Sequence, residues 1–234
     1  MKITVVGIGY VGLSIGLLLA KEHDVTFFDI DNKKIDLINK RQSPLKEAAI
    51  NKLLCKAKNI NATSSEELAY KDATFIILSL PTNLKVNKLD TSIIEISVSN
   101  ILKINKKATI VIKSTVPIGF TEYLRNRFHY NDIIFSPEFL REGSTIYDQL
   151  YPSRTIVGNE SRNSQLFLDI LTDISVEKDS PSLLVGSSEA EAIKLFSNAY
   201  LAQKIAFFNE LDTFAEMQNL DSKKLLRLWD MTRE

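Results

Sequence analysis

Cysteine, an excess of either charge and long apolar runs are what this 234-residue sequence has little of. A single cysteine excludes a disulfide framework and is typical of a reducing compartment, so we expect a cytoplasmic location. Lys plus Arg and Asp plus Glu number 29 each, which argues against a nucleic-acid-binding surface. The apolar runs are too short to span a bilayer and no signal peptide precedes the first strand-like run, which predicts a soluble protein with no membrane partner.

The sequence does contain a regular alternation of short apolar runs and helix-like segments. Apolar strands that alternate with helices indicate a parallel sheet covered on both faces, so the fold class predicted is α/β, a Rossmann-type doubly wound parallel sheet. Strands are expected at residues 2–6, 24–29, 60–62, 74–80, 109–112, 133–135, 155–157 and 182–185. Helices are expected at 13–22, 32–39, 46–58, 91–103, 121–128, 164–171 and 222–231.

The motif GIGYVG at residues 7–12 follows the first strand and opens a helix. Three glycines at this spacing allow a tight turn, a close approach to a pyrophosphate and close packing of the helix on the strand. Asp29 ends the second strand, where a carboxylate would accept hydrogen bonds from an adenosine ribose and repel a 2′-phosphate. These features predict NAD as the cofactor. The binding residues expected at the turn are Gly7, Gly9, Tyr10, Val11 and Gly12.

Two less specific readings stay open at the adenosine end of this site. Asp29 could simply end a strand. Lys33 and Lys34 follow it and could reach the adenosine, although a solvated lysine pair explains them equally well.

Three later stretches fall at or near the carboxyl ends of expected strands, where open parallel sheets bind ligands. They read LPTN at residues 80–83, KSTVPIG at 113–119 and FSPEFLRE at 135–142. Each places a hydroxyl or a carboxylate beside a proline, which restricts the backbone and so helps to aim its neighbours. We therefore expect a site at this edge of the sheet.

Residues 187–219 contain neither proline nor glycine and predict one long helix that begins at a capping box, Ser188 with Glu191. Apolar side chains surround it in nearly every direction, which is typical of a helix packed between other bodies. Lys194 and Asn198 lie one turn apart among apolar residues and could both donate to one oxygen. We take this pair as a marker of the site.

Six segments carry a family resemblance: GIGYVG, PTN, KSTVPIG, FSPEFLREG, YPSRTIVG and SEAEAIKLFSNAYLAQKIAFFNEL. In this order they closely resemble the N-terminal half of the UDP-glucose 6-dehydrogenases, which belong to the wider group of NAD-dependent nucleotide-sugar dehydrogenases. The resemblance covers essentially the whole chain. It implies oxidation of a sugar C6 alcohol in two steps, through an enzyme-bound thiohemiacetal and thioester, with reduction of two NAD and formation of the uronic acid.

The resemblance also assigns roles to residues. Thr115 matches the threonine that orders a catalytic water, and Glu138 matches the carboxylate that assists thioester hydrolysis. Lys194 and Asn198 match the pair that stabilises the developing oxyanion, a charge that preorganised donors stabilise strongly. Cofactor contacts are implied at Asp29, Lys34, Pro81, Thr82, Ser114, Thr115 and Glu142, and sugar contacts at Glu138, Phe139, Leu140, Arg141, Lys194 and Asn198.

One departure from the family is decisive. The family's nucleophilic cysteine lies in a glycine-rich segment after the central helix, followed by a UDP-binding domain, and residues 1–234 contain neither. Cys55 is instead expected to be a small, partly buried residue of its own helix. Residues 1–234 are therefore expected to be unable to complete turnover. Arg154 is expected to form a structural salt bridge, and His23 and His129 suggest no metal site.

The predicted organisation is an NAD-binding domain over residues 1–186 and a dimerisation region over 187–234 that holds the long helix and a short one. The aromatic residues of the long helix exceed what one helix face needs to cover a sheet, which predicts a homodimer through residues 187–219. Three alternatives stay open: a UDP-N-acetyl-sugar dehydrogenase, a β-hydroxyacid-type dehydrogenase, which also uses Lys and Asn one turn apart on a long helix, and a non-catalytic NAD-binding dimerisation module.

Overall fold

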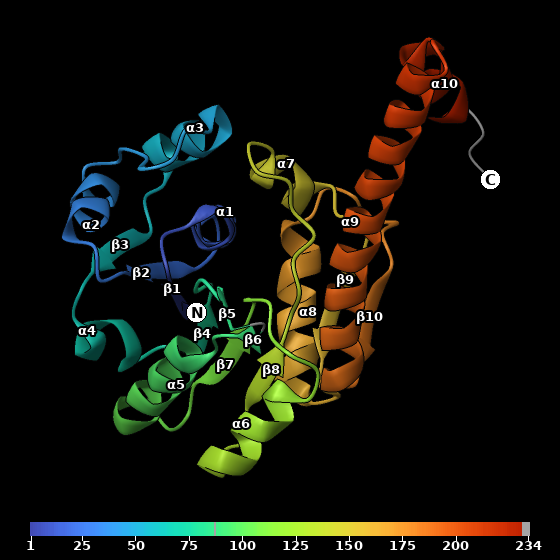
Figure 1. Ribbon diagram of the computed structural model, residues 1–234. Coiled ribbons are helices and arrows are strands. Elements are labelled where there is room, and N and C mark those ends of the chain that lie inside the picture. Colours follow the sequence, from blue (N-terminus) through green and yellow to red (C-terminus); the bar gives the residue numbers. More distant parts are fainter. Residues whose placement is uncertain (87, 231–234) are drawn as a thin grey trace. The chain divides into compact units, whose positions relative to one another are not determined.

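The computed structural model describes residues 1–86 and 88–230. The chain forms two compact units, Met1–Ala192 and Ile193–Glu234. The first unit contains the sheet and the helices that cover it (Figure 1). The second contains most of the long helix α9 (Ser187–Met217), whose first residues belong to the first unit, and the short helix α10 (Ser222–Asp230).

An eight-stranded sheet forms the centre of the first unit, in the strand order β10-β9-β8-β7-β4-β1-β2-β3. The inner strands β1, β4, β7 and β8 are rich in Val and Ile and almost completely buried, as strands covered on both faces must be. The strands are β1 (Lys2–Val6), β2 (Asp24–Phe28), β3 (Ile60–Thr63), β4 (Phe75–Leu78), β7 (Thr109–Ile112), β8 (Ile133–Phe135), β9 (Thr155–Gly158) and β10 (Ser182–Val185).

Helices cover both faces of this sheet (Figure 1). The strand order runs outward in both directions from the neighbours β1 and β4, so the fold is Rossmann-type and doubly wound. One face carries α1 (Tyr10–Leu19), α2 (Asn32–Asn39), α3 (Ala48–Lys56), α7 (Thr145–Leu150) and α8 (Arg162–Ile174). The other carries α4 (Glu66–Tyr70), α5 (Ser92–Ile104) and α6 (Phe120–Phe128).

The expected parallel sheet is confirmed for six strands and is wrong for the last two. Strand β9 pairs antiparallel with β8 through Phe135 and Gly158, and β10 then pairs parallel with β9. The segment between β8 and β9 contains only the six-residue α7 and does not cross back over the sheet. Strand β9 consequently begins at the edge where β8 ends. Residues 151–154 therefore lie at the same edge as the carboxyl ends of β4, β7 and β8.

Helices α4 and α7 and a short hairpin escaped the sequence analysis. Helix α7 is too short for a helical period to be visible, and the hairpin of β5 (Leu84–Lys85) and β6 (Lys88–Leu89) has two residues in each strand. The other expected elements are present with ends shifted by a few residues, and Met231, the expected end of the last helix, lies outside the described residues. Within the described part of the chain, no helix is both long and apolar enough to cross a membrane.

Candidate functional site

The glycine turn between β1 and α1 has the shape that a bound pyrophosphate requires. A Cβ at Gly7 would lie 2.4 Å from the Ser79 carbonyl oxygen, and one at Gly12 would lie 2.1 Å from the Gly7 carbonyl oxygen. Glycine is thus dictated by packing at both positions, and Gly7 also has a φ of +98°. A Cβ at Gly9 would meet no atom within 4 Å, so the surface over the middle glycine is open.

The start of α1 is ready to receive an anion. Gly9 caps the helix, and among the described residues no side chain accepts a hydrogen bond from its first turn, which begins at Tyr10 and Val11. The unpaired N–H groups and the helix dipole favour a phosphate at this position. The dinucleotide predicted from the sequence therefore fits the turn.

Asp29 lies at the adenosine side of this turn and is 9% exposed. Its Oδ2 accepts a hydrogen bond from the Ile8 N–H at 2.8 Å, and its Oδ1 accepts one from the Asp31 N–H at 3.0 Å. The Lys34 ammonium lies 3.4 Å from the same Oδ2. The carboxylate thus joins the glycine turn to the start of α2, and its negative charge is held where a ribose would bind.

The carboxyl ends of β4 and β7 are joined beside the glycine turn. The Ser114 hydroxyl accepts a hydrogen bond from the Leu80 N–H at 2.8 Å and donates to the Leu80 carbonyl at 2.7 Å. The Thr82 hydroxyl donates to the Thr115 carbonyl at 2.7 Å. The structure therefore brings Thr82, Ser114 and Thr115 together with the intervening Pro81, as expected from the sequence.

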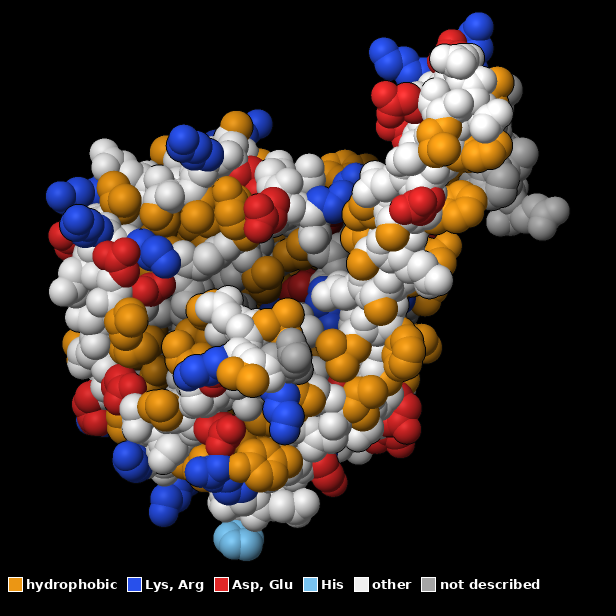
Figure 2. Space-filling model, in the orientation of Figure 1, with side chains coloured by type: hydrophobic (Ala, Val, Ile, Leu, Met, Phe, Trp, Pro, Cys, Tyr) orange, Lys and Arg blue, Asp and Glu red, His pale blue; other side chains and the backbone are white. Residues whose placement is uncertain are grey.

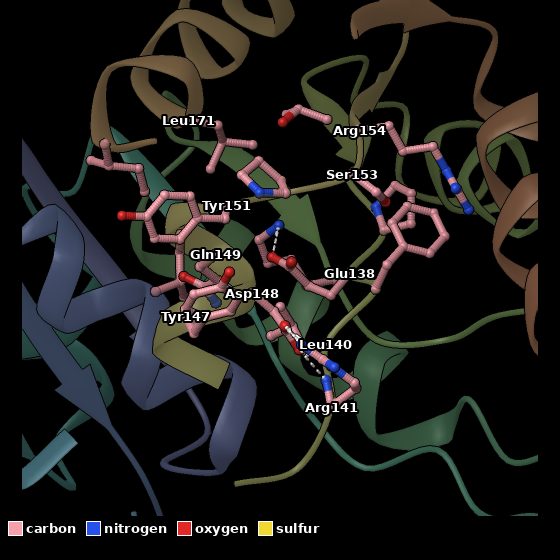
Figure 3. Close-up of a pocket in the computed structure, with 17 residues that line it drawn as sticks. Glu138, Leu140, Arg141, Tyr147, Asp148, Gln149, Tyr151, Ser153, Arg154 and Leu171 are labelled. Atoms are coloured by element: carbon pink, nitrogen blue, oxygen red, sulfur yellow. Dashed lines mark hydrogen bonds and ion pairs between the residues drawn. The ribbon is translucent and has the colours of Figure 1, made fainter. Parts of the chain in front are cut away.

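A pocket of about 310 Å³ lies next to these strand ends, within the first unit. Its lining comes from the segment after β8, from α7 and from the segment before β9, with Ile15 of α1 and two residues of α8. Figure 3 shows Glu138 in the middle of this pocket, Tyr147 and Tyr151 on one side, and Ser153 and Arg154 on the other.

Charge in the pocket is organised in two ion pairs (Figure 3). Glu138 pairs with the ammonium of Lys113, whose side chain is 1% exposed. Arg141 pairs with Asp148 of α7, with 2.5 Å between Nη2 and Oδ1. Burial alone would raise the pKa of Asp148, but hydrogen bonds and the charge of Arg141 outweigh it and lower the pKa. The hydrogen bond to Asp148 in turn raises the pKa of Arg141.

Aromatic rings complete the pocket wall. Tyr147 and Tyr151 stack with 4.8 Å between ring centroids. The guanidinium of Arg154 lies 4.0 Å from the centroid of the Phe139 ring, a cation–π contact that sequence reasoning did not anticipate. Leu140 lines the same pocket, whereas Glu142 is exposed and is not among the lining residues.

Two buried carboxylates hold the helices next to the site. Glu47 accepts hydrogen bonds from the Thr145 hydroxyl at 2.9 Å and from the Ile146 N–H at 3.2 Å, at the start of α7. Glu191 accepts from the N–H groups of Gly119 at 2.6 Å and Thr121 at 2.8 Å, at the start of α6. Both carboxylates accept hydrogen bonds from N–H groups that a helix start leaves unpaired, where the helix dipole also favours a negative charge.

The Glu191 contacts make the expected capping box with Ser188 wrong, because that carboxylate serves α6 instead of its own helix. Helix α9 already begins at Ser187. Lys194 and Asn198 follow on α9 in the second unit, Lys194 half-buried and Asn198 exposed.

Cys55 is exposed on α3, so the expectation of a partly buried cysteine is wrong. Its sulfur lies 3.7 Å from the Arg41 carbonyl oxygen. The helix buries Leu54 and turns the next position to solvent. In the part of the chain that the structure describes, His, Cys, Asp and Glu side chains form no group of three or more that could hold a metal ion.

Sequence reasoning missed Lys113, Tyr147, Asp148 and Tyr151 as site residues. A signal for Lys113 was present in the sequence. This lysine directly follows the apolar run of β7, which places its charge at the carboxyl end of a buried strand. The α7 residues carried no comparable local signal.

Comparison with known proteins agrees with this geometry. Residues 1–174 match the NAD binding domain of the UDP-glucose/GDP-mannose dehydrogenase family, and residues 188–234 match its central domain. The chain belongs to this family. It therefore contains the family's NAD-binding domain.

The most similar relatives include two UDP-glucose 6-dehydrogenases. That of Streptococcus pneumoniae is 43% identical over 235 residues, covering 97% of this chain and 60% of the relative. That of Campylobacter jejuni is 43% identical over 232 residues, covering 97% of this chain and 59% of the relative. A crystal structure of a ternary complex of GDP-mannose dehydrogenase from Pseudomonas aeruginosa is 26% identical, with a TM-score of 0.88 over 97% of this chain and 56% of that one. The chain thus spans about 60% of the length of these curated relatives.

Proposed function

We propose that this chain is the NAD-binding and central-helix portion of a UDP-glucose 6-dehydrogenase, which oxidises UDP-glucose to UDP-glucuronate. The observation that carries the proposal is the pairing of an open Gly9 surface with the buried Asp29 carboxylate, next to a pocket that holds Glu138. Both named relatives at 43% identity support UDP-glucose over other nucleotide sugars.

In this proposal NAD would be held by Asp29, Lys34, the glycine turn, Pro81, Thr82, Ser114, Thr115 and Glu142. NAD supplies the hydride acceptor. The contacts of Asp29 with two backbone N–H groups hold its carboxylate for the ribose hydroxyls and against a 2′-phosphate.

The pocket around Glu138 is proposed to receive the sugar. Phe139, Leu140 and Arg141 form its wall. Glu138 is proposed to act on the water that hydrolyses the thioester, and Thr115 to order that water. Lys194 and Asn198 are proposed to stabilise the oxyanion, since two donors one turn apart on α9 can serve one oxygen.

Calorimetric titration of a polypeptide of residues 1–234 tests the cofactor. NADH is expected to bind at least tenfold more tightly than NADPH, a difference of about 1.4 kcal/mol. Equal affinity for both nucleotides, or no binding of either, would remove the cofactor argument.

Saturation-transfer NMR with UDP-glucose tests the sugar pocket. The glucose protons are expected to receive more saturation than the uracil protons, because the residues proposed to contact the sugar lie in this chain. Arg141→Ala should weaken the glucose signals, with Lys2→Ala as a control at an exposed ion pair. Strong uracil signals without glucose signals would contradict the assignment.

Residues 1–234 are expected to produce no UDP-glucuronate, because their single cysteine is exposed on α3 and lies outside every site motif. A thiol-dependent double oxidation at enzyme-like rates that survives Cys55→Ser would contradict this expectation.

A homodimer through α9 is part of the proposal. The helix exposes Phe196 (70%), Tyr200 (69%), Ile205 (54%), Phe207 (50%) and Phe214 (55%), an apolar surface that Figure 2 shows along the helix. Burying each such side chain contributes about 1.5–3 kcal/mol, and a two-fold pairing buries the same surface twice.

Sedimentation at micromolar concentration is expected to show a dimer, and Phe207→Glu with Phe208→Glu to shift it to monomer. A parent chain that sediments as a monomer would contradict the dimer, as would a double variant that remains fully dimeric.

The proposal also includes a division of the chain into residues 1–186 and 187–234. It includes a cytoplasmic location as well, because an exposed free cysteine is compatible with a reducing compartment.

A further inference from the structure

Lys113, at the end of β7, is a buried ammonium to which the proposed chemistry assigns no role. Its side chain is 1% exposed. The Nζ donates hydrogen bonds to the Ser136 carbonyl and hydroxyl oxygens, both at 3.2 Å, and lies 5.8 Å from the centroid of the Phe167 ring. A buried charge with this many contacts has very little freedom to move.

The contacts of Lys113 extend across three neighbouring strands. Ser136 directly follows β8, and its hydroxyl also donates to the Ile156 carbonyl of β9 at 3.2 Å. The ammonium is therefore fixed by the close-packed, buried centre of the sheet.

Glu138 comes from a less regular part of the chain. It lies in the segment between β8 and α7, outside the strands of the sheet, and its long side chain has several rotatable bonds. Its side chain is 15% exposed and lines the pocket, where its carboxylate pairs with the Lys113 ammonium.

Two other cations line the pocket, and both have contacts of their own. The Arg154 guanidinium lies 4.0 Å from the centroid of the Phe139 ring. The Arg141 guanidinium is bound by Asp148, and its side chain is 72% exposed. Lys113 is thus the buried cation whose ion pair with Glu138 joins the pocket to the sheet.

We propose that Lys113 is a positioning residue that holds the Glu138 carboxylate in one orientation in the pocket. This inference rests on the proposed function, in which Glu138 acts on a water. A buried ammonium without a counter-charge is strongly unfavourable, so the pair must form, and the rigid strand end then sets where the carboxylate lies. Activation of a water by a carboxylate depends on such placement, because small displacements lower the rate strongly.

The test uses residues 1–234 labelled with ¹³C at the glutamate carboxyl carbon. The Glu138 resonance is identified by its absence in Glu138→Gln. It is expected to be a single sharp line in the parent and to shift and broaden in Lys113→Met, because the carboxylate loses the buried ammonium that fixes its position. Lys113→Arg, which keeps the charge, should restore a single line. A Glu138 line unchanged in Lys113→Met would overturn the proposal.

Unfolding measurements add a double-mutant cycle. Lys113→Met is expected to lower the Tm by about 10 °C, as the loss of one partner of a buried pair does. Adding Glu138→Gln should recover part of this loss, whereas the matched cycle at the exposed pair of Lys2 and Asp72 should be additive. Additive effects at Lys113 and Glu138 would indicate a lysine that only fills space, against the proposal.

A second measurement covers the case in which Lys113→Met does not fold. The ¹⁵N resonance of the Lys113 ammonium is expected to be protected from solvent exchange in the parent and to lose this protection in Glu138→Gln, which is nearly isosteric. Unchanged protection would count against the ion pair.

NADH titration of the same samples distinguishes a failure of the proposed function from a failure of the positioning role. Absent NADH binding in the parent contradicts the proposed function, whereas normal binding with an unaffected Glu138 contradicts only the positioning role of Lys113.

Discussion

The glycine turn and the Glu138 pocket lie at the same edge of the sheet, yet they are built in different ways. The turn is made of backbone: Gly7, Gly9 and Gly12 lie within six residues of sequence, and their lack of side chains creates the binding surface. The pocket is made of side chains that reach it from β7, from the segment after β8 and from α7, and its charge is balanced by ion pairs. A backbone site is readable from local spacing, whereas a side-chain site depends on tertiary contacts.

The difference also predicts how each region fails. Substitutions in the turn act by steric exclusion, so their effect is decided by the space around one Cβ. Substitutions around the pocket act through unpaired buried polar groups, so their effect is decided by what the lost side chain leaves behind. The following measurements test this contrast.

The largest combined effect, on NADH binding and on thermal stability together, is expected at Gly12. Gly12→Ala places a Cβ 2.1 Å from the Gly7 carbonyl, and overpacking of this kind costs about 1–3 kcal/mol or more. NADH binding and thermal stability should both fall. Gly9→Ala is the matched control, since its Cβ meets nothing within 4 Å. It should keep the Tm and weaken NADH binding about 10–100-fold, or about 1.4–2.8 kcal/mol. A Gly12→Ala variant with parental stability would break the steric argument.

Removal of Glu191 is expected to have the next largest effect. Glu191→Ala leaves the N–H groups of Gly119 and Thr121 and the Thr121 hydroxyl without an acceptor, at about 1–3 kcal/mol for each buried donor left unpaired. Denaturant unfolding should therefore show a loss of at least about 2 kcal/mol. Glu189→Ala, at an exposed position of the same helix, should remain within about 0.5 kcal/mol of the parent. Equal losses in the two variants would show that helix propensity, not capping of α6, is responsible.

Asp29→Asn is expected to have an effect of intermediate size, on nucleotide affinity. One amide oxygen can replace only one of the two oxygens that accept from Ile8 and Asp31, and the negative charge is lost. NADH should bind about tenfold more weakly, about 1.4 kcal/mol, while NADPH is affected less because the repulsion of its phosphate disappears. Calorimetric titration with both nucleotides measures the change. Lys34→Met in the same background should remove any gain for NADPH, and an unchanged preference would contradict the role of the charge.

The smallest effect concerns pH and the pair of Arg141 with Asp148. Hydrogen bonds and the charge of Arg141 outweigh burial and lower the pKa of Asp148 in the folded state. A lowered folded pKa stabilises the fold above the unfolded value of about 3.9, and this contribution is lost as the pH falls through the folded value. The Tm of the parent should therefore fall slightly more than that of Asp148→Asn between pH 5 and pH 2. Identical slopes would show that the pair contributes nothing, as many exposed pairs do.

Much of the fold was predictable because it follows from local pattern. The strands β1, β7, β8 and β10 have the predicted ends, since each is a short run of mainly apolar residues between polar ones. Helix α9 ends two residues before the predicted position. The cofactor site was predictable for the same reason, because the turn is six residues long and Asp29 ends the next strand.

The reversal at β9 was not predictable from period or composition, since parallel and antiparallel strands at the edge of such a sheet have similar sequences. Nor was the exposed position of Cys55, which depends on the face of α3 that is buried. The sequence indicated the elements, but not the direction in which the chain crossed between them.

By itself, then, the sequence determined the alternating strands and helices, the glycine turn and the choice of an NAD-type cofactor, because these depend on neighbours a few residues apart. Only the tertiary structure decided the partners of the buried charges. Glu191 and Thr121 are 70 residues apart, and Glu47 and Thr145 are 98 apart. Lys113 meets Glu138 because β7 and β8 are adjacent in the sheet. Contacts of this range depend on the path of the whole chain, and a buried charge is satisfied by the group that this path brings to it.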